Sequence, residues 1–384
     1  MNRILLIKLS ALGDVMQTLP TLEALRAAHP RAEITWLVEE AAAPILARHP
    51  ALERVLTVRR QTWLQAAHSR RLRPAVWEEF SQVLRSLRQK PFDVVIDLQG
   101  LLKSALWTWL ARSPRKIGFA GTRELSYLAL SERLPAYDAD EHAVRRYLRL
   151  AAHLGAATTP IRWRLAVSPG AGARFRELWT GTGGPLMILH PGTRWPSKHW
   201  PPGSFAELAD ALVQIRQARV VFTGSVADRP LLARIRAAMR EEAIDLSGAT
   251  GLEDLARLFF HADAAVTTDT GPMHLAAAVG TPVAAIFGPT APWRTGPFGP
   301  QHRVVRTGAA CSPCRRRQCP DPVCLSDLPV EAVLAATLAV LDQDPQLHRR
   351  TRSRQVVRGQ EVDILEHQGA APEMDWRLRR SWRG

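Results

Sequence analysis

The sequence has no long apolar run and no clear targeting segment. No segment approaches the roughly 18 consecutive apolar residues that a membrane-spanning helix needs. The apolar stretch within residues 1–9 is too short for a secretory signal. We therefore expect a globular chain located in the cytoplasm. Its 384 residues suffice for two domains of ordinary size, each with its own core.

Signatures of nucleic-acid and dinucleotide binding are also missing. The chain has no zinc-finger spacing, no basic region with heptads and no aromatic–basic pattern of an RNA-binding sheet. After the first strand-like run, Ser10–Asp14 carries a single glycine where a dinucleotide-binding enzyme would have GxGxxG. These absences argue against a nucleic-acid partner and against an NAD-dependent oxidoreductase.

Lysine is scarce, and the strong positive charge comes mostly from arginine. The chain carries 51 lysines and arginines against 36 acidic residues, which gives a formal net charge of +15. Such a charge favours an anionic partner, for example an acidic membrane face or a phosphorylated or carboxylated substrate. A plain compositional preference for arginine is the alternative interpretation.

Cysteine is limited to four residues within one short stretch. A cytoplasmic setting argues against disulfides. Four clustered thiolates could hold a structural zinc ion or, with less support, an iron–sulfur cluster. Two gaps of four residues are tighter than the usual zinc layout, so reduced thiols without a metal are the alternative. Neither interpretation makes these residues catalytic. They are Cys311, Cys314, Cys319 and Cys324.

Apolar runs and turn residues predict two successive α/β halves. Residues 3–9 form an apolar run typical of a buried parallel strand, and a turn, a helical segment and a second strand at 32–40 follow. A turn-rich stretch precedes a second series of strands and helices that starts at 185. The expected fold class is α/β, with ligands at the carboxyl ends of the strands. The expected organisation is a first domain at 1–165, a linker at 166–184, a second domain at 185–345 and a basic, weakly ordered tail at 346–384.

The segment 266–289 contains the clearest candidate for an anion site. A short apolar run leads into Asp269-Thr270-Gly271-Pro272, and an alanine-rich helical segment and a further buried strand follow. Asp269 and Thr270 are good N-cap types, and Gly271 lets a ligand approach the backbone. A helix N-terminus at the end of a strand binds phosphate or diphosphate well. An ordinary capped turn is the alternative.

Two other turns carry candidate residues. Asp14 follows the first strand, where a carboxylate could act as general base on a hydroxyl or merely cap a helix. In the segment 190–201, Thr193 offers hydrogen bonds to a phosphate and Lys198 offers positive charge, although solvated loop residues would look the same. His274, early in the alanine-rich helix, could contact a phosphate or sugar or simply pack.

Six motifs, taken together and in order, resemble the bacterial lipopolysaccharide heptosyltransferases of glycosyltransferase family 9, and most closely the heptosyltransferase I group. The likeness extends from residue 1 to about 340. The motifs are IKLSALGDVMQTLPTLEALR, WLVEE, DVVIDLQGLLKSA, HPGTRWPSKHWP, FTGS and TTDTGPMHLAAAVGTPVAAIFGPT.

The resemblance implies a GT-B fold, in which two Rossmann-like domains face each other across a central cleft. It also implies an inverting transfer of heptose from ADP-heptose to the Kdo or inner-core region of lipopolysaccharide, with Asp14 as general base and no metal required for catalysis. Because that acceptor is anionic and membrane-borne, peripheral contact with the cytoplasmic face of the inner membrane is expected. The matching donor-binding positions are Thr193, Lys198, Asp269, Thr270, Gly271 and His274, and the basic acceptor-side positions are Arg60, Lys103 and Arg123.

Two features depart from the family pattern. One is the cysteine cluster with the basic tail, and the other is Asp228, which stands where the family often has a glutamate. The same fold acting on another nucleotide sugar or glycan acceptor is therefore an alternative. A second alternative is a non-catalytic module that docks on acidic membranes or nucleic acid. The variant Asp14→Ala would distinguish the two, because an enzyme would lose transfer while still binding its donor and a docking module would be unaffected.

Overall fold

The computed structural model describes residues 1–68, 74–344 and 350–369, and the chain divides into two compact units. The N-terminal unit contains Met1–Arg162 and the short segment Val357–Gln360. The C-terminal unit contains Trp163–Val356 and the residues from Glu361 onward. The expected linker at 166–184 holds the end of one strand and two short helical elements, η2 (Ala173–Phe175) and α7 (Glu177–Thr180).

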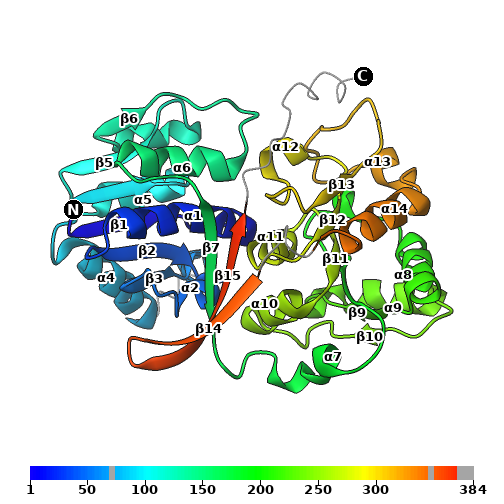
Figure 1. The fold of residues 1–384 in the computed structure, drawn as a ribbon. Coiled ribbons are helices and arrows are strands. Elements are labelled where there is room, and N and C mark those ends of the chain that lie inside the picture. Colours follow the sequence, from blue (N-terminus) through cyan, green and yellow to red (C-terminus); the bar gives the residue numbers. More distant parts are fainter. Residues whose placement is uncertain (69–73, 345–349, 370–384) are drawn as a thin grey trace. The chain divides into compact units, whose positions relative to one another are not determined.

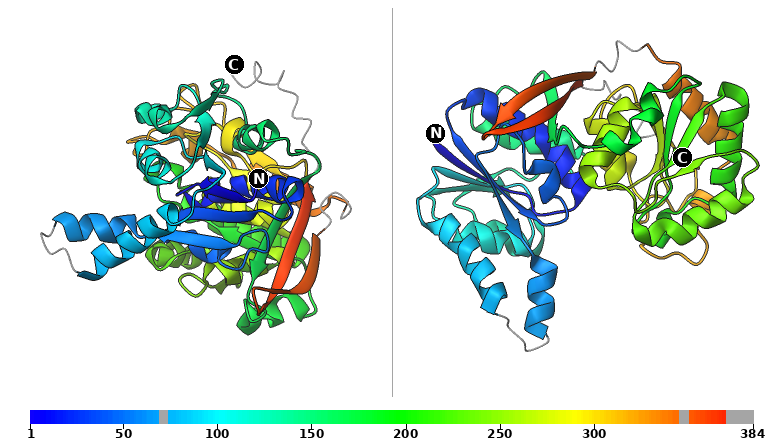
Figure 2. Two further views of the ribbon diagram at one scale, coloured as in Figure 1. Left: turned by 90° about the vertical axis from the view of Figure 1, so that its left-hand side faces the viewer. Right: turned by 90° about the horizontal axis from the view of Figure 1, so that it is seen from below.

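The N-terminal unit is built on a six-stranded parallel sheet of order β3-β2-β1-β4-β5-β6 (Figure 1). Its central strands are apolar runs buried on both faces, as parallel strands covered by helices require. Two of its helices, α3 and α4, project from the sheet as a pair (Figure 2). The strands are β1 (Arg3–Ile7), β2 (Glu33–Glu39), β3 (Arg54–Val58), β4 (Val94–Asp97), β5 (Arg115–Phe119) and β6 (Glu132–Leu134). The helices are α1 (Leu12–Ala28), α2 (Ala43–Leu46), α3 (Arg60–His68), α4 (Pro74–Arg88), α5 (Leu102–Leu110), η1 (Arg123–Ala129) and α6 (Ala143–His153).

The C-terminal unit repeats this plan with a six-stranded parallel sheet of order β10-β9-β8-β11-β12-β13. Its strands β8 and β11 are fully buried at the centre. The strands are β8 (Leu186–His190), β9 (Arg219–Phe222), β10 (Ile244–Asp245), β11 (Ala264–Thr268), β12 (Val283–Ile286) and β13 (Arg303–Val305). The helices are η3 (Pro196–Lys198), α8 (Pro202–Arg216), η4 (Val226–Asp228), α9 (Arg229–Ala238), α10 (Leu252–His261), α11 (Gly271–Ala278), α12 (Pro292–Thr295), α13 (Val323–Ser326) and α14 (Val330–Leu341). The predicted α/β class is confirmed in both units.

A third, three-stranded sheet changes the expected picture of the tail. Its order is β14-β15-β7, with β7 (Ile161–Val167), β14 (Arg350–Val357) and β15 (Gln360–Gly369). Weak order was expected from residue 346, but residues 350–369 form a hairpin whose strand β15 is well buried at Val362, Ile364 and Leu365. The hairpin was missed because β14 is arginine-rich and mostly exposed. The rest of the predicted tail, 346–349 and 370–384, lies outside the described residues.

Each unit has an apolar core around its sheet. One core cluster includes Leu5, Val95 and Trp107, and the other includes Leu189, Phe205 and Val266. Burying such side chains contributes about 1.5–3 kcal/mol each, so the cores dominate the stability of both units. Among the described residues, no helix combines the length and the apolarity needed to cross a membrane.

Candidate functional site

Both sheets have the strand order that creates a ligand-binding position at their carboxyl edge. The order reverses between β1 and β4 in one sheet and between β8 and β11 in the other. In open α/β sheets, ligands bind at such a reversal, beyond the carboxyl ends of the strands. The predicted site residues fall mainly on the turns that follow these strands, in both units.

In the N-terminal unit, Asp14 occupies the first turn of α1, directly after β1. Its Oδ2 accepts a hydrogen bond from the backbone N–H of Ala11 (3.1 Å), which fixes the carboxylate at the start of the helix. Its side chain is 35% exposed. The carboxylate therefore caps the helix with one oxygen, while the side chain stays partly open to solvent.

The second oxygen of Asp14 faces a buried cation. Lys8 Nζ lies 4.0 Å from Asp14 Oδ1, and the Tyr147 hydroxyl lies at 3.5 Å from the same oxygen. Lys8 Nζ also donates to the Tyr147 hydroxyl oxygen (2.6 Å) and to the Leu98 carbonyl (3.1 Å). The Lys8 side chain is 2% exposed, so three oxygen atoms replace the water that its ammonium has lost.

The electrostatics of this group favour a charged lysine. Burial lowers the pKa of Lys8, but the Tyr147 oxygen and the Asp14 carboxylate outweigh it, so the pKa of Lys8 lies above its ordinary value. Arg146 adds a second cation, with Nη2 at 3.4 Å from the Tyr147 hydroxyl oxygen. For Arg146 too, burial lowers the pKa and its neighbours, with Tyr147 foremost, raise it by more. Asp14 thus lies close to two cationic side chains.

A second buried carboxylate, Asp97, organises the turn after β4. It accepts hydrogen bonds from the N–H groups of Gln99 (2.9 Å) and Gly100 (3.0 Å) and from Ser104 Oγ (3.0 Å). Burial nevertheless raises the pKa of Asp97. The Gln99 side chain in turn accepts from the N–H groups of Leu9 and Ser10, both at 3.1 Å. The turns after β1 and β4 are therefore tied together around the position of Asp14.

The predicted acceptor-side cations are only partly brought together. Lys103 Nζ donates to Glu39 Oε1 (2.8 Å) and to the Ser10 hydroxyl, and Arg60 Nε lies 3.4 Å from the same Glu39 oxygen. Arg123 is exposed at the start of η1. The backbone N–H of Leu102 donates to Glu124 Oε2 (2.9 Å), which joins η1 to the start of α5. Lys103 and Arg60 thus share one carboxylate, whereas Arg123 stands on a neighbouring element.

In the C-terminal unit, a lysine–carboxylate pair occupies the corresponding edge. Lys198, at the end of η3, donates from Nζ to Asp269 Oδ2 (2.5 Å) and to the Asp269 carbonyl (3.3 Å). Thr290 Oγ1 donates to the same Asp269 oxygen (2.5 Å). Thr268 Oγ1 donates to the Gly192 carbonyl (3.2 Å), which links the turns after β8 and β11. The structure therefore brings Lys198 next to Asp269.

The other predicted donor residues lie on the same turns. Thr270 is the N-cap of α11, and Gly271 is its first residue. His274 lies one turn into this helix and is 8% exposed. Thr193, in the loop before η3, receives a contact from His199 Nε2 at its carbonyl oxygen (3.0 Å). The amino end of α11 thus opens beside the Lys198–Asp269 pair.

Asp228 holds the turn after β9. Its Oδ2 accepts from Ser225 N (2.7 Å) and Ser225 Oγ (2.6 Å). A Cβ on Gly192 would come within 2.6 Å of the Asp228 carboxylate carbon, so a larger residue at that position would have to displace this carboxylate. His190, at the end of β8, contacts Thr223 Oγ1 through Nδ1 (3.0 Å), and burial lowers the pKa of His190 to about 4. This part of the edge is held by the hydrogen bonds of the Asp228 carboxylate, by the His190–Thr223 contact and by close packing.

The four cysteines do not form the predicted metal site. Within residues 1–68, 74–344 and 350–369, no group of three or more His, Cys, Asp or Glu side chains is arranged to hold a metal ion. Cys324 is buried in the apolar core, and this burial raises the pKa of its thiol, whereas Cys311 is exposed. Cys319 Sγ is hydrogen-bonded to the Asp321 carbonyl (3.1 Å). The structural zinc expected from the spacing is therefore not supported.

The segment around the cysteines packs against the candidate anion site instead. Ser197 Oγ donates to the Arg316 carbonyl (2.6 Å), and Ser312 Oγ donates to the Gly288 carbonyl (2.6 Å). The Arg315 N–H donates to the Pro289 carbonyl (2.7 Å). These bonds hold three consecutive arginines near η3 and the turn after β12.

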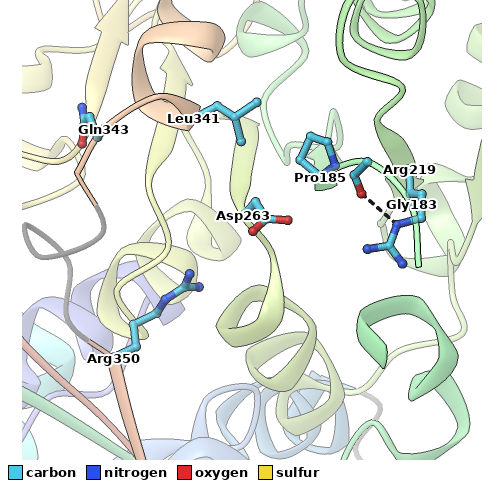
Figure 3. Close-up of a pocket in the computed structure, with 8 residues that line it drawn as sticks. Gly183, Pro185, Arg219, Asp263, Leu341, Gln343 and Arg350 are labelled. Carbon is cyan, nitrogen blue, oxygen red and sulfur yellow. Dashed lines mark hydrogen bonds between the residues drawn. The ribbon is translucent and has the colours of Figure 1, made fainter. Parts of the chain in front are cut away.

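A cavity of about 450 Å³ lies elsewhere in the C-terminal unit (Figure 3). Pro185 and Asp263 directly precede β8 and β11, and Arg219 begins β9, so the cavity is at the amino edge of the sheet. Arg219 Nε donates to the Gly184 carbonyl (3.0 Å), and Arg350 Nη1 donates to the carbonyls of Phe260 and Ala262. Its arginines bond the backbone, and none of the predicted donor residues lines it.

Sequence reasoning missed several members of these groups, among them Lys8, Glu39, Asp97 and Tyr147. Lys8 could have been found, because a lysine within an otherwise apolar strand needs a partner. Asp97 gave a similar signal at the end of an apolar run. Tyr147 gave none, because 139 residues separate it from Lys8 and only the packing of α6 on α1 brings them together.

Comparison with known proteins identifies the family of this chain. A family model described as glycosyltransferase family 9 (heptosyltransferase) matches residues 80–324. Lipopolysaccharide heptosyltransferase 1 of Pseudomonas aeruginosa is 35% identical over 83% of this chain and 87% of its own length. Lipopolysaccharide heptosyltransferase 2 of Salmonella typhimurium is 31% identical over 79% of this chain and 88% of its own.

Solved structures give the same result for the fold. The Escherichia coli heptosyltransferase WaaC with ADP matches with a TM-score of 0.66 and 30% identity, over 79% of this chain and 92% of that one. E. coli ADP-heptose LPS heptosyltransferase II matches with a TM-score of 0.68 and 28% identity, over 89% and 98%. The predicted GT-B fold class is confirmed. The chain is a glycosyltransferase and belongs to glycosyltransferase family 9, the heptosyltransferases.

Proposed function

We propose that this enzyme transfers heptose from ADP-heptose to the inner-core region of lipopolysaccharide, with inversion at the transferred carbon. The names of its relatives support the acceptor class. Matching structures that contain ADP or ADP-2-deoxy-2-fluoro heptose support the donor; the second is 29% identical to this chain, with a TM-score of 0.67, over 86% of this chain and 97% of that one. The observation that carries the proposal is the partly exposed Asp14 carboxylate beside the buried Lys8 ammonium, at the reversal of strand order.

In the proposed reaction, Asp14 acts as the general base. Its carboxylate takes the proton of the attacking acceptor hydroxyl while the oxygen forms a bond to the anomeric carbon of the donor. The bond from that carbon to the diphosphate breaks on the opposite face, so the configuration inverts. Lys8 and Tyr147 position the carboxylate, and their contacts make Asp14 a stronger candidate than a helix cap alone.

The C-terminal unit would bind the donor. The departing ADP carries a growing negative charge, which Lys198 and the amino end of α11 stabilise without a metal ion. Asp269 holds Lys198 in place through its 2.5 Å contact, and the N–H groups at the amino end of α11, where Thr270 is the N-cap and Gly271 the first residue, would bind an anion. Thr193 and His274 would contact the diphosphate and the sugar side of the donor.

The N-terminal unit would bind the acceptor. Lys103 and Arg60, which share Glu39, and the exposed Arg123 offer positive charge to the carboxylate and phosphate groups of a lipopolysaccharide inner core. Because such an acceptor is part of a lipid, the enzyme would work in peripheral contact with an anionic membrane surface.

Donor binding and transfer by the purified protein in EDTA test the proposal. In calorimetry, ADP-heptose and ADP should bind in preference to UDP-sugars and NAD. The transferred heptose should carry the inverted anomeric configuration by NMR. Preference for a UDP-sugar would change the substrate, and failure to bind any nucleotide would overturn the assignment of the donor site.

Asp14→Asn tests the general base. It should lower the transfer rate by roughly 10²- to 10⁴-fold with unchanged ADP affinity. Glu40→Gln is a matched control, because Glu40 is an exposed carboxylate at a strand end and is paired with Arg59. Full transfer by Asp14→Asn would show that Asp14 is not the base.

A further inference from the structure

A group of exposed apolar side chains lies on α5 and η1 of the N-terminal unit. On α5, Leu102, Leu106 and Trp109 are 63%, 49% and 67% exposed. On η1, Leu125 and Leu128 are 61% and 64% exposed. Residues 102, 106 and 109 are spaced by four and three, so they share one face of the helix. We call these five residues the α5–η1 surface.

The two elements are fixed to one another, so the surface is preformed. The Leu102 N–H donates to Glu124 Oε2 (2.9 Å), and a Cβ on Gly100 would meet Thr122 at 2.9 Å. Glu124 and Leu125 both have a left-handed backbone, with φ of 57° and 56°. This conformation is disfavoured for residues with a side chain, and here it accompanies a leucine that points into solvent.

Basic residues surround the apolar side chains. Lys116 Nζ donates to the Trp109 carbonyl (2.9 Å), and Arg112 follows the end of α5 and is exposed. Arg123 begins η1, and the guanidinium of Arg133 lies 5.3 Å from the Tyr127 ring within η1.

Fewer acidic than basic residues lie near the α5–η1 surface, and the acidic ones already have hydrogen-bond partners within the unit. Glu124 bonds the backbone of α5, and Glu132 bonds Arg115 (3.0 Å) and also contacts His153. The surface is therefore apolar with a basic margin.

We propose that the α5–η1 surface docks on the anionic membrane that carries the acceptor. This inference rests on the proposed function, because a lipid-linked acceptor requires the acceptor-binding unit to reach a bilayer. Tryptophan and leucine enter the interfacial region of a bilayer, and arginine and lysine bind its anionic headgroups.

The position of the candidate acceptor residues fits this docking. Lys103 is the second residue of α5, and Arg123 is the first residue of η1. The same two elements therefore present the apolar surface and the cations that would bind the sugar part of the acceptor. A lipid held by its acyl chains in the bilayer would expose its headgroup next to these cations.

Co-sedimentation of the full chain with vesicles tests the inference. Wild-type protein should bind vesicles of phosphatidylethanolamine and phosphatidylglycerol, and should bind vesicles of phosphatidylcholine far more weakly. The double variant Leu106→Ser/Trp109→Ser should bind the anionic vesicles at least roughly tenfold more weakly. Ile215→Ser on α8 is the matched control, since Ile215 is 55% exposed on the other unit and should not change binding.

Two readouts separate the inference from the proposed function. With a water-soluble, deacylated acceptor, the double variant should transfer heptose as fast as wild type. If the double variant lost vesicle binding but the wild-type protein transferred no heptose, the proposed function would be contradicted and the docking surface would still be supported. Leu125→Ser/Leu128→Ser repeats the test on η1 in case the first variant folds poorly.

Two results would overturn the inference. One is vesicle binding by both folded double variants at the wild-type level. The other is a change of oligomeric state in these variants with unchanged vesicle binding, which would make the surface a contact between protein chains.

Discussion

Lys8 illustrates how a single residue links stability to function in this fold. It directly follows the central strand β1 and is 2% exposed, so an unpaired ammonium at this position would be strongly destabilising. The Leu98 carbonyl, the Tyr147 hydroxyl and the Asp14 carboxylate compensate for the lost water. The same contacts that make the buried lysine tolerable also orient the candidate base. A substitution at Lys8 would therefore change both folding and transfer, and Asp14 is the better position for a mechanistic test.

His190 gives a pH-dependent prediction at the residue scale. Burial holds its pKa at about 4, below the ordinary value of 6.5. The folded protein favours the neutral form of His190. The free energy of unfolding that comes from this neutral, buried imidazole is therefore fully present above pH 6.5 and is lost as the pH falls toward 4. The difference corresponds to about 3 kcal/mol. The free energy of unfolding of wild type and of His190→Asn can be measured by denaturant titration between pH 7 and pH 4. It should decrease less with falling pH in the variant than in wild type.

His261 is the control for this prediction. Burial also lowers its pKa to about 4, but His261 stacks on Trp179 (4.5 Å between ring centroids) away from the carboxyl edge. His261→Asn should likewise make the pH dependence shallower, and only His190→Asn should disturb donor binding. Equal slopes for wild type and His190→Asn would contradict the assignment of a buried neutral histidine.

At the scale of elements, a buried ion pair joins the β14–β15 hairpin to α10, and the more exposed Arg354 and Arg352 of β14 pair with the same carboxylate. Arg257 Nη2 on α10 donates to Asp363 Oδ2 on β15 (2.6 Å), and the side chains are 3% and 2% exposed. Removing one partner leaves the other charge buried, which costs about 3–5 kcal/mol. Asp363→Asn should lower the free energy of unfolding by that amount in denaturant titrations. Asp342→Asn, which breaks the exposed Arg216–Asp342 pair, should cost at most about 1 kcal/mol.

A hydrophobic replacement of both partners sharpens this test. Arg257→Met/Asp363→Leu should recover much of the lost stability, because neither charge then remains buried. If Asp363→Asn costs no more than Asp342→Asn, the hairpin is not held by the pair.

The elements also show what the sequence can and cannot predict. The strands β1 and β11 follow from apolar runs, and the positions of Asp14 and Lys198 follow from the turns after such runs. The β14–β15 hairpin could not be predicted in the same way. Strand β14 is rich in exposed arginines and lacks an apolar pattern, and the buried residues lie on its partner β15. Its two-residue turn, Arg358–Gly359, has φ of 48° and 75°, which suits the twist of a hairpin. The zinc site predicted from the cysteine spacing is not supported, because the geometry of metal ligands depends on the folded chain and not on spacing alone.

At the scale of the whole molecule, the candidate binding cations fall into two groups, one in each unit. One group of cations, with Lys103 and Arg60, belongs to the N-terminal unit, and another, with Lys198, belongs to the C-terminal unit. A net charge of +15 by itself favours anions in general. The two carboxylate partners, Glu39 and Asp269, instead fix particular cations at the carboxyl edge of each sheet, and the proposed function assigns the acceptor to the first group and the donor to the second.

This division predicts that donor and acceptor binding can be weakened separately. Lys198→Ala should raise the Kd for ADP and lower the transfer rate by roughly 10²- to 10³-fold, because the charge on the leaving diphosphate is then less stabilised. Lys103→Ala should raise the KM for the acceptor and leave the Kd for ADP unchanged. Calorimetry with ADP and steady-state kinetics with varied acceptor measure the two effects. If Lys103→Ala weakened ADP binding as strongly as Lys198→Ala, the assignment of one ligand to each unit would be wrong, although the family membership would stand.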